Sequence, residues 1–167
     1  FFTEKICSVA SSAGLIQYPY AEIERAEEDL LNAEFHDILP GSSIKTGGEE
    51  AGIRKLQHGI EELTKVRAKA FFALSNGFDR VEEEAYPIFV FNPHPYETDA
   101  TVDCEFMLAN QNWENDFTFF TAYDGDKALP SQIIQEASNL NLDWRKHILF
   151  DCKLKPLSMN RFYCVPY

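Results

Sequence analysis

A histidine and an aspartate lie next to each other in the segment AEFHDILPGSSI, residues 33–44, just before a sharp reversal of the chain. The preceding residues predict a helix, so His36 should lie in its last turn, where a cationic or donor side chain meets the negative helix end. Asp37 is unfavourable at the same place for the same reason. Pro40-Gly41 and two serines then fix the backbone and could hold both side chains in one orientation. The pair is therefore either a helix end or part of an active site.

One histidine and one aspartate do not complete a metal site, because zinc usually has three or four protein ligands. The sequence near this segment offers no further ligand. If His36 binds a metal, the remaining ligands must come from another domain.

The three other histidines have simpler explanations. His58 lies off the apolar stripe of its predicted helix, which favours a solvated surface residue. His94 lies between two prolines in a turn, and His147 alternates with the buried residues of a strand, so it should point outward. A dense run of carboxylates should cover the outer face of a helix: Glu22, Glu24, Glu27, Glu28 and Asp29. There is no G-x-S-x-G motif and no glycine-rich loop after a strand.

Four cysteines are scattered along the chain, with no C-x-x-C pair and no ligand-like spacing to a histidine: Cys7, Cys104, Cys152 and Cys164. At least three of them fall in strand patterns, where cysteine acts as a small apolar residue. We expect reduced structural thiols, a reducing compartment and a cytoplasmic location, with one disulfide as the alternative.

Charge and composition narrow the class of protein. A net charge of -12 and a pI near 4.7 disfavour binding to nucleic acid or acidic membranes, because the protein's own field would repel them. The hydrophobic content of 45% and the mean hydropathy of -0.30 indicate a globular protein. Apolar runs stay far below the roughly 20 residues that span a bilayer, so we expect neither a span nor a leader. Because the chain does not begin with methionine, we expect it to be a piece of a longer protein.

Helical spacing of apolar residues dominates the first half of the chain. It predicts a helix over residues 1–13 and a second one from just after Pro19 to Pro40-Gly41, with Ile23, Ala26, Leu30 and Ala33 as its buried stripe. A third helix, over about 49–74, has the longest periodic pattern. The three helices should form an antiparallel three-helix bundle.

Strand patterns follow Tyr86-Pro87. The segment 88–91 is a short apolar strand, and ATVDCEFML and HILFDCKL alternate between apolar and polar residues. Asp124-Gly125 is a hairpin-type turn signal. The predicted fold class is α+β, with a three-helix bundle over residues 1–84 and part of an antiparallel β-sandwich-like domain over residues 85–167.

These segments resemble a known family. LLNAEFHDILPGSSI looks like the signature of the middle domain of glycoside hydrolase family 38, the α-mannosidases, in which Phe-His-Asp or His-His-Asp precedes a small-residue loop. PIFVFNPHPYE is similar to the start of that family's C-terminal β domain, and LPSQ and RFYCVPY resemble its later strands. The resemblance covers nearly the whole chain, with Glu34 as a departure because many members have glutamine there.

The resemblance implies an N-terminal β/α barrel, then a three-helix bundle, then β-sandwich domains, of which this chain would hold the bundle and the first part of the β domain. It implies zinc bound by a histidine and two aspartates of the barrel and by one bundle histidine, which matches His36. Asp37 matches the aspartate that contacts sugar hydroxyls. The nucleophile and the acid/base of a retaining glycosidase match no residue here, so we expect no catalytic residue in this fragment.

The leading hypothesis is a fragment of a retaining, metal-dependent α-mannosidase that hydrolyses terminal α-mannosides and is inactive alone, with no zinc bound to the fragment. Its partner would be an α-mannoside or a mannose-containing oligosaccharide, and we also expect self-association into a homo-oligomer. Nucleic acid and membranes are not expected partners. The alternative is a non-catalytic module that binds a protein or a carbohydrate, which would have no need of the Phe-His-Asp loop.

Overall fold

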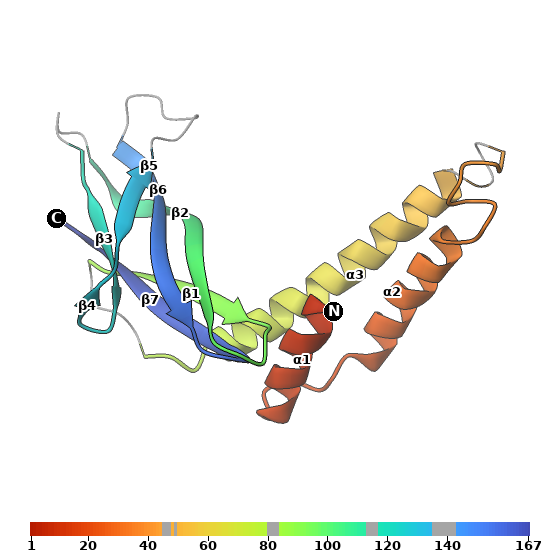
Figure 1. Cartoon of the computed structure of the whole chain (residues 1–167), viewed down its shortest axis with the longest axis horizontal. Coiled ribbons are helices and arrows are strands. Elements are labelled where there is room, and N and C mark those ends of the chain that lie inside the picture. The colour runs from red at the N-terminus through yellow and green to blue at the C-terminus, as the bar shows by residue number, and fades with distance from the viewer. Residues whose placement is uncertain (45–47, 49, 80–83, 113–116, 135–142) are drawn as a thin grey trace. The chain divides into compact units, whose positions relative to one another are not determined.

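The chain folds into a helical unit, residues Phe1–Gly77, and a β unit, residues Phe78–Tyr167 (Figure 1). This computed structural model describes residues 1–44, 48, 50–79, 84–112, 117–134 and 143–167. Three helices precede strands that form antiparallel sheets, so the predicted α+β fold class is confirmed.

The helical unit contains α1, Phe2–Ser12, α2, Tyr20–Ala33, and α3, Glu50–Ser75. Just beyond α1, Gly14 has a φ of +73°, a conformation that glycine adopts without strain. The second helix begins directly after Pro19, as predicted. It runs antiparallel to α3 (Figure 1). The predicted start of the third helix, residue 49, lies outside the described residues.

Small residues bring α2 and α3 close together. A Cβ atom at Gly59 would lie 3.3 Å from the carbonyl oxygen of Ala26, so the backbones approach closely at this point. Other parts of α3 are less covered than its periodic pattern suggests, because Ile53 and Ile60 remain 50% and 64% exposed. The apolar period therefore identified the helix correctly but overstated how much of that face is buried.

The end of the second helix was predicted wrongly. α2 ends at Ala33, and the N–H of Phe35 already bonds to the carbonyl of Asn32 instead of continuing the helical pattern. The carbonyl of Phe35 then accepts hydrogen bonds from Ile38 and Leu39, which closes a separate turn. His36 and Asp37 therefore lie beyond the helix and not in its last turn, so the helix dipole does not explain their positions.

The β unit contains two antiparallel sheets. Their strands are β1 Tyr86–Asn92, β2 Thr98–Asn112, β3 Phe120–Asp124, β4 Lys127–Ala128, β5 Ser131–Ile134, β6 Asp143–Leu154 and β7 Ser158–Pro166. One sheet has the order β1-β7-β3-β4 and the other β2-β6-β5. The predicted hairpin turn is present between β3 and β4, where Gly125 has a φ of +58°.

The two sheets pack against each other through aromatic side chains. The rings of Phe150 on β6 and Phe162 on β7 lie 5.4 Å apart, and those of Phe106 on β2 and Phe120 on β3 lie 5.0 Å apart. The alternating residues predicted for one face of each strand lie in or against this core: Ala100, Val102, Cys104, Phe106 and Leu108 on β2, and Ile148, Phe150, Cys152 and Leu154 on β6. The predicted sandwich-like arrangement is therefore confirmed.

A buried asparagine fixes the loop between β1 and β2. The Asn92 amide group donates to the carbonyls of Leu154, at 3.1 Å, and Tyr96, at 3.0 Å. Its oxygen accepts a hydrogen bond from the backbone N–H of His94 at 3.0 Å. One side chain thus ties the start of this loop to β6 and to the end of the same loop.

Candidate functional site

The predicted histidine–aspartate pair lies on a compact turn after α2. Within this turn the N–H of Ile38 bonds to the carbonyl of Phe35 at 2.8 Å, and the N–H of Gly41 bonds to the carbonyl of Ile38 at 3.0 Å. Gly41 has a φ of +70°, which glycine allows and most residues resist. The turn therefore has a defined backbone conformation, as the Pro-Gly signal suggested.

The structure brings His36 and Asp37 together at the surface. Nε2 of His36 lies 3.5 Å from Oδ2 of Asp37, and the two side chains are 78% and 58% exposed. The imidazole ring also contacts the ring of Phe35, with their centroids 4.3 Å apart. Both polar groups are thus accessible to a molecule or a domain that approaches this turn.

The pair does not make a metal site on its own. Among the described residues, the side chains of His, Cys, Asp and Glu form no group of three or more that could hold a metal ion. An exposed imidazole does suit one position in a metal site whose other ligands come from elsewhere. The described part of this chain therefore fits the supply of one ligand and not the assembly of a complete site.

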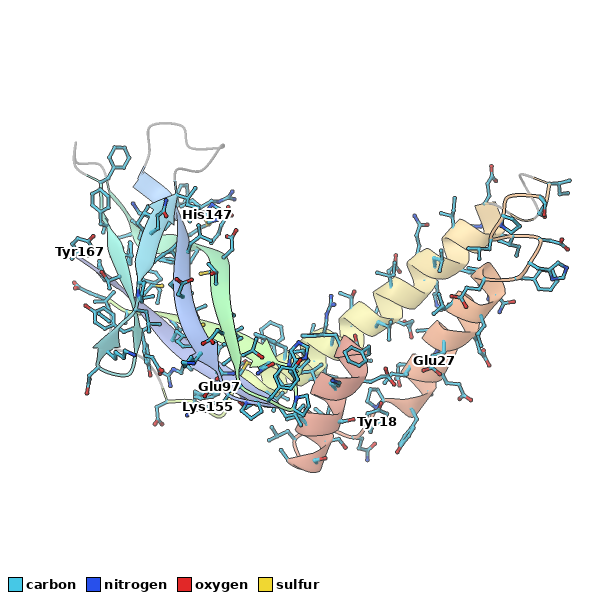
Figure 2. All side chains as sticks on the ribbon, viewed as in Figure 1. Tyr18, Glu27, Glu97, His147, Lys155 and Tyr167 are labelled. Atoms are coloured by element: carbon cyan, nitrogen blue, oxygen red, sulfur yellow. The ribbon has the colours of Figure 1, made fainter. Side chains whose placement is uncertain are left out.

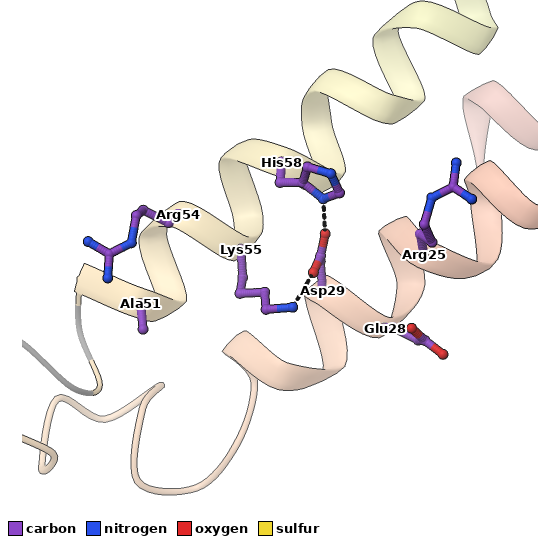
Figure 3. A pocket seen from close by; sticks show the side chains of 7 residues that line it. All are labelled: Arg25, Glu28, Asp29, Ala51, Arg54, Lys55 and His58. Atoms are coloured by element: carbon purple, nitrogen blue, oxygen red, sulfur yellow. Dashed lines mark hydrogen bonds and ion pairs between the residues drawn. The ribbon is translucent and has the colours of Figure 1, made fainter.

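A second polar cluster, which was not predicted from the sequence, joins α2 to α3. Asp29 is only 4% exposed, and its carboxylate lies 2.5 Å from Nδ1 of His58 and 2.9 Å from Nζ of Lys55. Figure 3 shows both side chains of α3 directed at this carboxylate. We call these three residues the Asp29 cluster. Its hydrogen bonds, first from His58 and then from Lys55, hold the pKa of Asp29 below its ordinary value.

The prediction for Asp29 was wrong, because this residue is buried and does not lie on the outer face of its helix. His58 is 54% exposed, so it lies at the surface as predicted, but it also pairs with that carboxylate. Leu30, which was predicted to be buried, is 47% exposed, and its neighbour Asp29 is buried instead. Lys55 and His58 are three residues apart on α3, a spacing that places both side chains on one face of the helix, where they can meet one carboxylate.

A surface pocket of about 510 Å³ lies over the Asp29 cluster (Figure 3). Seven residues line it: Arg25, Glu28, Asp29, Ala51, Arg54, Lys55 and His58. Its arginines already face carboxylates, since Arg25 lies 2.9 Å from Glu62 and Arg54 lies 4.0 Å from Glu50. We therefore interpret the pocket as a surface depression over the polar contact between α2 and α3.

The remaining histidines agree with their predicted positions. His147 lies on β6 of the β unit (Figure 2), where its ring bonds to Asp103 on the neighbouring strand. His94 lies in the loop between β1 and β2, and its ring stacks on Tyr96 with centroids 5.1 Å apart. Both have local partners that account for them.

All four cysteines are free thiols. Burial raises the pKa of Cys104 and of Cys152 to about 11, and that of Cys164 to about 12. Because the thiolate is the nucleophile, these three thiols are protonated and unreactive near neutral pH.

The helices of the described chain also lack the combination of length and apolar character needed to cross a membrane.

A comparison with protein families finds a match that covers most of the helical unit. Residues 3–74 match the family described as the alpha mannosidase middle domain. The match lies within the helical unit and confirms the resemblance of the Phe-His-Asp segment to the middle domain of α-mannosidases. His36 and Asp37 lie within the matched residues. A search of curated proteins found no match.

Proposed function

We propose that this chain is the middle part of a longer, retaining and metal-dependent α-mannosidase that hydrolyses terminal α-mannosides. The observation that carries the proposal is the exposed His36–Asp37 pair on a defined turn, within residues matched to an alpha mannosidase middle domain. The nucleophile and the acid/base would come from a separate barrel domain, so the chain alone would be inactive.

His36 is proposed as one ligand of a zinc ion whose other ligands lie in that barrel. The support is an accessible imidazole on a defined turn, within the residues that match an alpha mannosidase middle domain. When bound, zinc supplies a positive charge that orients substrate oxygens and offsets negative charge. The contribution of this chain is to hold the imidazole at a fixed point on the turn.

Asp37 is proposed to bind the sugar. Its carboxylate is exposed beside His36 and can accept hydrogen bonds from sugar hydroxyls. A hydrogen bond to a charged group contributes about 1.5–3 kcal/mol, which is roughly tenfold to more than a hundredfold in rate if the bond strengthens in the transition state. The substrate would be an α-mannoside or a mannose-containing oligosaccharide.

The proposal also covers location and partners. Free buried thiols suit a reducing compartment, so we propose a cytoplasmic enzyme. The net charge of -12 disfavours nucleic acid and acidic membranes as partners.

The test uses the longer protein that contains this chain and an aryl α-mannoside as substrate. We expect Asp37→Asn to retain its metal and to lose roughly tenfold to more than a hundredfold in kcat. Glu34→Gln is the matched control, because it removes a neighbouring exposed charge outside the pair and should keep the rate. If Asp37→Asn is as active as the control, the sugar-binding role is wrong. If the intact protein does not hydrolyse α-mannosides, a non-catalytic binding module becomes the better account.

A further inference from the structure

The side chain of Ile38 packs the His36–Asp37 turn against α3. Phe35, His36, Asp37 and Leu39 are all exposed, whereas Ile38 is partly covered. A Cβ atom added at Gly52, in the first turn of α3, would lie only 2.6 Å from Cγ2 of Ile38. Ordinary carbon contacts are about 3.5–4.0 Å, so the isoleucine occupies space that any other residue at position 52 would fill.

A second glycine lies close to the segment that follows the turn. A Cβ atom at Gly48 would overlap Oγ of Ser43. Glycine is unfavourable in a helix compared with alanine, so Gly52 within α3 calls for a structural reason. The close contact with Ile38 provides that reason.

A displacement of Ile38 would also displace His36 and Asp37. The N–H of Ile38 bonds to the carbonyl of Phe35, and its own carbonyl accepts from Gly41. His36 and Asp37 lie between these bonded positions. A shift of Ile38 away from α3 must therefore break the turn or carry both side chains with it.

We propose that Gly52 is a positioning residue for the His36–Asp37 pair, acting through the side chain of Ile38. The contact itself follows from the geometry, while its consequence for metal and substrate rests on the function proposed above. Metal sites and catalytic groups tolerate displacements of only a few tenths of an ångström, so a methyl group at position 52 should disturb both.

The first test uses this chain and does not depend on any activity. Amide hydrogen exchange is measured for Ile38 and Gly41 in Gly52→Ala, with the amide of Ala70 in α3 as an internal check that the helical unit remains folded. We expect exchange at Ile38 and Gly41 to become at least about tenfold faster, with Ala70 unchanged. Gly77→Ala is the matched control, because no atom lies within 4 Å of a Cβ at that position. Unchanged exchange in the turn of Gly52→Ala overturns the proposal.

The second variant isolates the contact. Ile38→Ala removes the side chain that meets position 52, so it should loosen the turn without adding any atom to α3. In that background Gly52→Ala should have little further effect, because coupled positions are not additive. If Gly52→Ala is equally damaging with and without Ile38, the contact is not its cause and the proposal is wrong.

The final arm uses the longer enzyme and compares zinc affinity and the visible spectrum after cobalt replaces zinc. We expect Gly52→Ala to weaken metal binding at least about tenfold and to shift the cobalt spectrum, with Gly77→Ala unchanged. If His36→Ala loses the metal while Gly52→Ala keeps full affinity, an unaltered spectrum and full rate, the positioning role is refuted and the proposed function stands. If His36→Ala also keeps its metal, the proposed function fails, and the role of Gly52 at the metal fails with it.

Discussion

Asp29 shows how one buried carboxylate can join two helices. On α2 it lies close to Gly59 of α3, so the helices meet with little intervening bulk. Lys55 supplies a positive partner and His58 a hydrogen bond, and both offset the cost of removing this charge from water. The carboxylate therefore stabilises the pairing of α2 with α3 only while it is ionised.

We predict that Asp29→Asn destabilises the helical unit at pH 7 and has much less effect near pH 3. The folded-state pKa of Asp29 is lowered, so its contribution is present above its unfolded pKa, near 4, and is lost as pH falls through the folded pKa. The urea midpoint measured by circular dichroism at both pH values is the test. Glu28→Gln, which alters an exposed neighbour, is the control. An equal loss of stability at pH 7 and pH 3 would contradict the assigned role.

The residues of the candidate site differ in how far they could be predicted. His36 and Asp37 were proposed from the sequence because they are adjacent and lie in a recognisable segment, and their roles stay predictions. Asp29 was missed because its burial depends on Lys55 and His58, which are far away in the sequence. Neighbouring positions on a helix differ by only about 100° in direction, so a local pattern does not decide whether Asp29 or Leu30 faces the partner helix.

At the scale of elements, hydrogen bonds of individual loops set the ends of helices and strands. The long strands β2 and β6 were predictable, because alternation of apolar and polar residues follows directly from the pleat. The end of α2 could not be predicted in this way. The Phe35 carbonyl accepts hydrogen bonds from the N–H groups of Ile38 and Leu39, so the helix ends several residues before the proline that was predicted to end it. Proline limits how far a helix can extend but does not require it to extend that far.

We predict that Asn92→Ala destabilises the β unit by about 2–3 kcal/mol, because buried partners left unsatisfied cost about 1–3 kcal/mol each. The change would leave the carbonyl of Leu154 and the N–H of His94 without the Asn92 side chain. The free energy of unfolding is measured by chemical denaturation, with near-ultraviolet circular dichroism as the signal. The exposed Asn110→Ala should stay within about 0.5 kcal/mol of the parent. A similarly small change for Asn92→Ala would show that the loop holds without this amide.

At the scale of the molecule, the helical unit leaves much apolar surface uncovered. Leu31, Ile60 and Phe72 are more than half exposed, and a groove of about 250 Å³ lined partly by Ile60 crosses all three helices. Exposed apolar surface of this kind promotes association. The third helix was readily predicted from the spacing of its apolar residues. The exposure of those residues could not be predicted, because it depends on how much of α3 is covered by α1 and α2.

We predict that this chain self-associates in solution and that Ile60→Ser reduces the association. Sedimentation velocity at several concentrations should show sedimentation coefficients that rise with concentration for the parent and rise less for the variant. Lys69→Ser on the same helix changes an exposed charge and serves as the control. Strictly monomeric behaviour of the parent at all concentrations would contradict the prediction.

The most direct measurement is the zinc content of the longer protein with and without His36. Inductively coupled plasma mass spectrometry of the parent, His36→Ala and His94→Ala compares the proposed ligand with a histidine that already has a local partner in its loop. We predict that the parent and His94→Ala contain stoichiometric zinc and that His36→Ala loses most of it, because removal of a ligand opens the coordination sphere. Full zinc content in His36→Ala would contradict the account and would leave His36 as an exposed residue of the turn after α2.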